Sequence, residues 1–280
     1  MLTTPALEIL KRERPDVRVG VAVEDRFRGV FDDHPCVGDI LPPRAGAIRR
    51  WRPALCLNFH GGTRSAWLTA CSGARWRAGF AHFRFQAVYN VRIPRAQEIL
   101  GEERAVHTAE HLASAMFFLG AQRTEIPRAR LAAPADGAAL PPRPYAVIHP
   151  AATAPEKAWA ASGFAAVALR LAETGVHPVV IGAAQDDLAA FGRFATVRGA
   201  SLGEIKRLMA SASLFVGNDS GPAHMAAAFG VPSVVIFGPS NAAVWGPWRT
   251  PAEVVSSPGG IGEVSVSRVL ESLARLGAAA

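Results

Sequence analysis

Val216-Gly-Asn-Asp-Ser-Gly-Pro-Ala-His224 joins an apolar run to a helical pattern through a tight polar turn, which is the passage from strand to helix that an α/β sheet repeats. Asp219 and Ser220 are residue types that cap helices, and they stand directly before the helix expected over 221–229. The amide groups in the first turn of such a helix form a site for an anion. An ordinary capped helix with His224 in its first turn explains the same residues equally well.

The sequence around this stretch alternates between apolar runs and helical patterns, which predicts a parallel sheet covered on both faces. Strands are expected at 145–149, 176–182, 213–217, 232–237 and 253–255. Helices are expected at 159–173, 185–193, 201–211, 221–229 and 264–277. Ligands of such sheets bind at the carboxyl ends of the strands, so the loops after His149, Gly182 and Gly217 are the candidate site.

The first half of the chain is less regular but also predicts an α/β lobe. Helices are expected at 5–13, 26–32, 64–72 and 107–119, and strands at 17–23, 55–59 and 75–80. The lobe opens directly at a helix, with Thr4 as the expected N-cap and Pro5 at the first position. A doubly wound lobe normally opens with a strand and a glycine-rich turn, so that pair is expected to be missing here.

The stretch 132–144, AAPADGAALPPRP, is a linker signal between these two patterned regions. We therefore predict a lobe over residues 1–135, a linker over 136–144 and a second lobe over 145–280.

Composition excludes several classes of protein. Half of the 280 residues are hydrophobic, and 26 glycines and 21 prolines are close to ordinary usage, which excludes collagen and low-complexity disorder. No apolar run reaches the ~18–20 residues of a membrane span. The three cysteines form no CxxC pair, and the N-terminus lacks the apolar stretch of a signal peptide. These features predict a cytoplasmic protein without a zinc knuckle.

Positive charge is concentrated in the first half. Residues 40–97 hold ten arginines and no acidic residue. Such a stretch favours phosphates, carboxylates or an anionic membrane surface over an ordinary mixed-charge face. Arg49, Arg50, Arg52 and Arg64 are the candidate anion-binding residues, the last of them in a Gly-Gly-Thr-Arg-Ser loop that could also merely cap a helix.

Two further loops follow expected strands. Lys157, in Ile148-His-Pro-Ala-Ala-Thr-Ala-Pro-Glu-Lys-Ala-Trp159, falls at or near a helix start, where a cation opposes the helix dipole unless an anion lies between. It indicates a phosphate ligand, although a solvent-facing side chain is a simpler explanation. Asp186, just past a strand end, suits ribose hydroxyls or plain helix capping.

Several catalytic motifs are missing. The sequence has no Walker A, GxGxxG or HExxH motif and no Asp-x-Asp pair. The charge of a diphosphate would then fall to lysine, arginine and helix dipoles, which predicts chemistry without a metal or another cofactor.

Taken in order, four stretches resemble glycosyltransferase family 9, the lipopolysaccharide heptosyltransferases and their relatives. They are TTPALEILKRERPD, NFHGGTRSAWLTACSGARWRAGF, HPAATAPEKAW and GNDSGPAHMAAAFGVPSVVIFGPS. The resemblance implies a GT-B fold of two Rossmann-like lobes facing across a cleft. The acceptor side would be N-terminal, and the nucleotide-sugar donor would bind the C-terminal lobe.

The resemblance also implies a reaction: inverting transfer, without metal, of a sugar from a donor that is typically ADP-heptose. Donor-binding roles fall on Thr153, Lys157, Asp186, Asn218, Asp219, Ser220, Gly221 and His224. The arginine-rich stretch would suit a phosphorylated glycolipid acceptor at the cytoplasmic face of the inner membrane.

One departure from the family concerns its general base. The base is an Asp in the glycine loop immediately before the segment matching Leu2–Pro5, and that loop is expected to be missing from this chain. This favours, as an alternative, a nucleotide-sugar-binding protein with impaired catalysis. A nucleic-acid binder ranks last, because the aromatic residues among the arginines (Trp51, Trp67, Trp76, Phe80, Phe83, Phe85) fit core positions at least as well.

Overall fold

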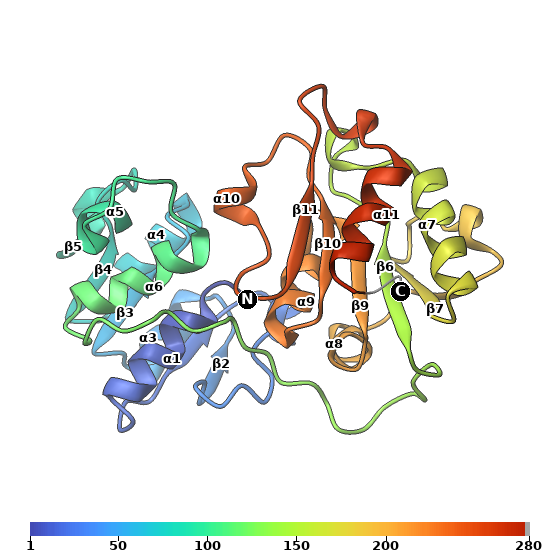
Figure 1. Cartoon of the computed structure of the whole chain (residues 1–280). Coiled ribbons are helices and arrows are strands. Elements are labelled where there is room, and N and C mark those ends of the chain that lie inside the picture. Colours follow the sequence, from blue (N-terminus) through green and yellow to red (C-terminus); the bar gives the residue numbers. More distant parts are fainter. Residues whose placement is uncertain (278–280) are drawn as a thin grey trace. The chain divides into compact units, whose positions relative to one another are not determined.

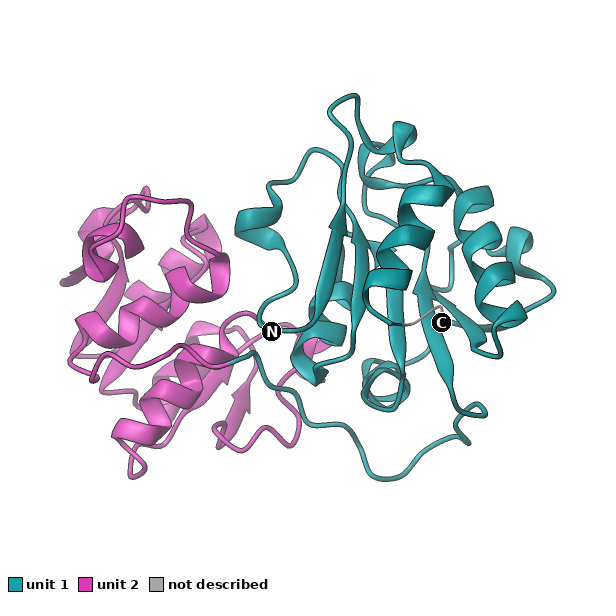
Figure 2. Ribbon diagram, viewed as in Figure 1, with its two compact units in different colours: residues 1, 128–280 teal, residues 2–127 magenta. Residues whose placement is uncertain are grey.

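The computed structural model describes residues 1–277, which form two compact units (Figure 2). The N-terminal unit comprises residues 2–127, and the C-terminal unit comprises Met1 and the residues from Arg128 onward. The boundary precedes the predicted linker, and the linker stretch is not a free tether. The guanidinium of Arg207 donates a hydrogen bond to the carbonyl oxygen of Ala138, which lies inside the predicted linker. This stretch therefore belongs to the C-terminal unit.

The C-terminal unit is built on one parallel sheet of six strands in the order β11-β10-β9-β6-β7-β8 (Figure 1). The strands are β6 (Tyr145–His149), β7 (His177–Gly182), β8 (Ala195–Arg198), β9 (Leu214–Asn218), β10 (Ser233–Ile236) and β11 (Ala252–Val255). The central strands β6, β9 and β10 are buried almost throughout, because continuous apolar runs such as Leu-Phe-Val and Val-Val-Ile can be covered on both faces.

Helices cover both faces of this sheet. Helices α7 (Ala161–Glu173) and α11 (Val266–Arg275) contact each other and share one core with Ile148, Val216 and Ile236. Helices α8 (Leu202–Ala210) and α9 (Gly221–Phe229) contact each other on the other side, and a short helix, α10 (Ala242–Trp245), follows β10. The strand order is that of a doubly wound fold, in which the chain reverses direction between β6 and β9.

The predicted elements of this unit are confirmed except at one place. The helix predicted over 185–193 is wrong: the structure has a 3-10 turn, η3 (Ala189–Phe191), followed by the strand β8. β8 lies at the edge of the sheet and is mostly exposed. An edge strand needs no continuous apolar run, so its sequence carried no strand signal.

The N-terminal unit has two separate parallel sheets. One pairs β1 (Gly20–Ala22) with β2 (Asp39–Leu41), and the other has the order β3-β4-β5 over Leu55–Asn58, Trp76–Phe80 and Val91–Ile93. The helices are α1 (Thr4–Glu13), α2 (Asp25–Arg28), α3 (Ala45–Trp51), α4 (Thr63–Ala70), α5 (Ala96–Leu100) and α6 (Thr108–Phe118). The short elements β2, α3, β5 and α5 were not predicted, and Thr3 rather than Thr4 is the N-cap of α1.

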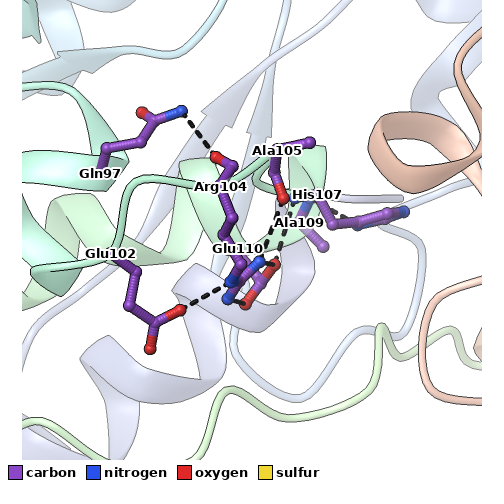
Figure 3. Close-up of polar contacts among 7 residues, drawn as sticks. All are labelled: Gln97, Glu102, Arg104, Ala105, His107, Ala109 and Glu110. Atoms are coloured by element: carbon purple, nitrogen blue, oxygen red, sulfur yellow. Dashed lines mark hydrogen bonds and ion pairs between the residues drawn. The ribbon is translucent and has the colours of Figure 1, made fainter.

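The start of α6 shows how polar contacts fix this unit (Figure 3). Nδ1 of His107 accepts the Ala109 amide proton, and Glu110 accepts the amide proton of His107 at 3.1 Å. Arg104 bonds Glu110 through two nitrogens, at 2.9 and 2.7 Å, and Glu102 at 2.6 Å. The Arg104 guanidinium lowers the pKa of the Glu110 carboxyl.

Within residues 1–277 no helix is long and apolar enough to cross a bilayer.

Candidate active site

The carboxyl ends of β6 and β9 lie side by side at the point where the strand order changes direction. Doubly wound folds bind their ligands at such a point. Asn218, the last residue of β9, is fully buried there. Its Oδ1 accepts the Trp159 amide proton at 3.1 Å, and its Nδ2 donates to the Pro150 carbonyl at 2.8 Å. Both ends of the loop after β6 are thus tied to β9. Asn218, predicted as a donor contact, has its amide group engaged in positioning this loop.

Lys157 sits in that loop, at the end of the 3-10 turn η2 (Pro155–Lys157), and α7 begins only at Ala161. Its Nζ lies 3.2 Å from Oδ2 of Asp219, whose side chain is 9% exposed while that of Lys157 is 32% exposed. The ion pair brings together two predicted site residues from different loops. It places a cation directly beside the start of α9.

Gly238 supports this arrangement from the segment after β10. A Cβ at position 238 would collide with the backbone carbonyl oxygen of Glu156 and lie 3.5 Å from Cα of Lys157. Only glycine therefore allows the loop with Lys157 to lie against the Phe237-Gly238-Pro239 turn.

Ser220, Gly221 and His224 lie in or next to the first turn of α9. Ser220 is the N-cap residue, but its side chain makes no capping hydrogen bond, so the predicted capping by Ser220 is wrong. Instead Oγ of Ser220 lies 3.1 Å from Nδ1 of His149. Gly221 is exposed, and an added Cβ there would meet no described atom within 4 Å. The start of α9 is therefore open to a ligand.

His149, at the end of β6, connects this turn to the loop after β7. Burial lowers the pKa of His149 to about 4, and the charge of Asp186 partly opposes that shift. The carboxylate of Asp186 is fixed, because its Oδ2 accepts the Ala183 amide proton at 2.7 Å. Thr153, the remaining predicted donor contact, is exposed in the loop after β6.

Sequence reasoning missed two of these residues, His149 and Gly238. His149 belongs to the motif 148–159, from which only Lys157 was proposed as a site residue. Its position as the last residue of a predicted central strand could have indicated a site residue. Gly238 follows a strand directly, which was the signal for a close backbone approach.

The four candidate arginines lie in the N-terminal unit and fall into two sets. Arg49 and Arg50 lie in the last turn of α3, and Arg52 caps it with a positive φ of 57°. All three are exposed, and none has an ion-pair partner among residues 1–277. Arg64, on α4, instead bonds Glu24 at 2.9 Å. The structure therefore leaves three of the four guanidinium groups available for an anion.

The aromatic residues among the arginines do not all fit the core. Phe80 is fully buried, whereas Trp67 is 58% exposed and Trp76 is 47% exposed. The guanidinium of Arg75 lies 5.0 Å from the ring of Trp76. The expectation of core positions therefore holds for Phe80 and is wrong for these two tryptophans.

Comparison with known proteins identifies the family. The model of glycosyltransferase family 9 (heptosyltransferase) matches residues 47–263. Lipopolysaccharide heptosyltransferase 1 of Pseudomonas aeruginosa is 26% identical over 85% of this chain and 75% of its own length. Lipopolysaccharide heptosyltransferase 3 of Escherichia coli is 35% identical over 37% of this chain, which spans about a third (34%) of that relative.

A solved structure shows the same fold over nearly the whole chain. The structure of E. coli heptosyltransferase WaaC with ADP superimposes with a TM-score of 0.79 at 19% identity, covering 98% of this chain and 95% of that one. This confirms the predicted α/β fold of GT-B type. With the family match over most of the sequence, the conclusion is that the chain belongs to glycosyltransferase family 9, the heptosyltransferases, and is a glycosyltransferase.

Proposed function

We propose that this protein transfers heptose from ADP-heptose, with inversion and without a metal ion, to a phosphorylated acceptor of the lipopolysaccharide-core type. The observation that carries the proposal is that Lys157, Asp219 and Ser220 lie together at the start of α9. This place is beside the β6–β9 pair, where the strand order of the sheet changes direction. The relatives named above, heptosyltransferases and a heptosyltransferase with ADP, support heptose and ADP as the donor's parts.

In this proposal the donor lies along the carboxyl edge of the sheet. Its diphosphate meets the amino group of Lys157 and the open amide groups of α9, and its ribose meets Asp186 after β7. Thr153, Gly221 and His224 border the same groups. Asn218 contributes by holding the loop that carries Lys157.

The chemistry follows from charge. As the oxygen of the acceptor hydroxyl attacks the anomeric carbon, its proton passes to a general base and the bond from that carbon to the diphosphate breaks. Negative charge therefore grows on the departing ADP. A lysine and a helix N-terminus aimed at that charge lower the barrier without a metal ion. Lys157 leaves its pairing with Asp219 for the phosphate, and the Asp219 carboxylate becomes available to the hydroxyl groups of the sugar.

The acceptor side rests on the N-terminal unit. Arg49, Arg50 and Arg52 are the available cations for a phosphorylated glycolipid, and a place at the inner face of the inner membrane follows from that acceptor.

A thermal-shift panel with ADP, UDP, GDP, CMP and ADP-heptose tests the donor. A ligand at 100 times its Kd adds about 2.7 kcal/mol of stability, so ADP and ADP-heptose should raise the Tm while the others leave it unchanged. Release of ADP in the presence of heptose-deficient lipopolysaccharide, with a matching mass increase of the acceptor, then tests transfer. Stabilisation by another nucleotide alone would overturn the proposed donor, and no stabilisation by any would overturn the site.

A further inference from the structure

The N-terminus of α9 differs from those of neighbouring helices in what its serine does. A serine at the N-cap normally accepts an amide proton from the first turn. Ser201 does this for α8, and Ser265 does it for α11. Ser220 occupies the same position in α9 with extended backbone angles (φ −158°, ψ 171°), yet its hydroxyl caps nothing within residues 1–277.

The hydroxyl of Ser220 is engaged by His149 instead. Its Oγ lies 3.1 Å from Nδ1 of His149, which ends the neighbouring strand β6 in register with Gly217. The imidazole is part-buried and neutral, so its ring nitrogen either accepts the hydroxyl proton or donates its own. Either way the oxygen lies at the ring, away from the first turn of α9.

The first turn of α9 offers few amide donors for the hydroxyl to occupy. The helix begins at Gly221, and its second residue is Pro222, which has no amide proton. Ala223, at the third position, holds the N–H that an N-cap serine would ordinarily take. That same N–H is one of the donors that the start of a helix presents to a phosphate.

We propose that His149 is a positioning residue that holds the Ser220 hydroxyl away from its own helix, so that the amide group of Ala223 stays open for the donor's diphosphate. The inference rests on the proposed function, because it concerns the same diphosphate. It assigns His149 no contact with the reacting atoms. Without His149, Ser220 turns back and caps α9, and the ligand must then displace that cap.

Two single variants and their double variant test the proposal through ADP affinity, measured by isothermal titration calorimetry. An N-cap bond of ordinary strength corresponds to about a fivefold change in an equilibrium constant. His149→Leu should therefore weaken ADP binding about fivefold. His149→Asn should keep wild-type affinity, because the amide of asparagine reaches Ser220 as Nδ1 does. In the Ser220→Ala background, His149→Leu should have no further effect, since no hydroxyl remains to cap the helix.

The outcomes separate this proposal from a structural role and from failure of the site. If His149 only fills space, His149→Leu weakens ADP binding equally with and without Ser220, and His149→Asn fails to restore it; either result overturns the proposal. Ser201→Ala removes the ordinary cap of α8 and should lower the Tm without changing ADP affinity. If the wild-type protein binds no ADP, the proposed function fails and this inference fails with it. If the wild-type protein binds ADP but the effects of His149→Leu and Ser220→Ala on ADP affinity simply add, only this inference is overturned.

Discussion

The two units differ in how many sheets their parallel strands form. In the C-terminal unit one six-stranded sheet brings the loops after β6, β7, β9 and β10 to a single edge, where Lys157 reaches Asp219 and His149 reaches Ser220. In the N-terminal unit five short strands form two sheets, and the candidate arginines lie on two helices. A continuous doubly wound sheet thus gathers residues distant in sequence into one site, whereas divided sheets leave charge spread over a surface.

Lys157→Ala is the most direct test of whether the C-terminal unit holds one local binding site. A hydrogen bond to a charged group contributes about 1.5–3 kcal/mol, so ADP affinity should fall about ten- to a hundredfold. Calorimetric titration with ADP measures it. Arg170→Ala, which removes an exposed cation from α7 in the same unit, is the matched control and should leave ADP binding unchanged. Equal losses in both variants would contradict a local site.

Gly238→Ala tests whether the C-terminal edge depends on close backbone packing. The new Cβ meets the Glu156 carbonyl, a backbone atom, so we expect a loss of about 2–3 kcal/mol in the free energy of unfolding and weaker ADP binding. Urea denaturation and titration with ADP measure the two effects. Gly262→Ala adds a Cβ that meets no described atom within 4 Å and should be nearly neutral. Unchanged ADP affinity in Gly238→Ala would show that the position of the loop carrying Lys157 does not affect ADP binding.

The buried His149 predicts a pH dependence that belongs to the C-terminal unit. Its folded pKa of about 4 lies below the usual 6.5, so the unfolded chain binds a proton that the folded chain does not. Its contribution to stability is complete above pH 6.5 and is lost as pH falls towards 4, by about 1–2 kcal/mol once the partial exposure of the ring is allowed for.

Urea denaturation at a series of pH values, on wild type and on His149→Asn, measures this contribution. The variant should lose less stability between pH 6.5 and 4, because asparagine does not titrate. His111, in the N-terminal unit, also has its pKa lowered to about 4 by burial and by His82, and accounts for part of the remaining slope. Identical slopes in the two proteins would show that His149 does not titrate in this range.

The smallest effect concerns the arginines. Replacing Arg49, Arg50 and Arg52 together by alanine should raise the KM for a phosphorylated acceptor about three- to tenfold, because exposed charges contribute less than about 1 kcal/mol each. ADP affinity should not change. Arg64→Ala, whose guanidinium already bonds Glu24, should change the KM less. A larger effect of Arg64 would mean that its ion pair opens for the acceptor.

Sequence reasoning recovered the central strands of the C-terminal unit and most of its helices, because their apolar runs are continuous and their helices amphipathic. It placed Lys157, Asp186 and Asp219 at the correct loops for the same reason. It failed at β8, β2 and β5, which are short strands at sheet edges, and at the capping role of Ser220, which depends on a residue 71 positions away.

The α/β class, the parallel sheet and the family could be predicted from the amino-acid sequence, since each depends on local pattern or on contiguous motifs. Which side chains contact one another could be learned only from the folded chain. The pairing of β6 with β9 sets His149 beside Ser220, and the buried amide of Asn218 fixes the loop of Lys157. Such contacts depend on strand order and on the closeness of two backbones, and neither is encoded in the spacing of residues along one chain.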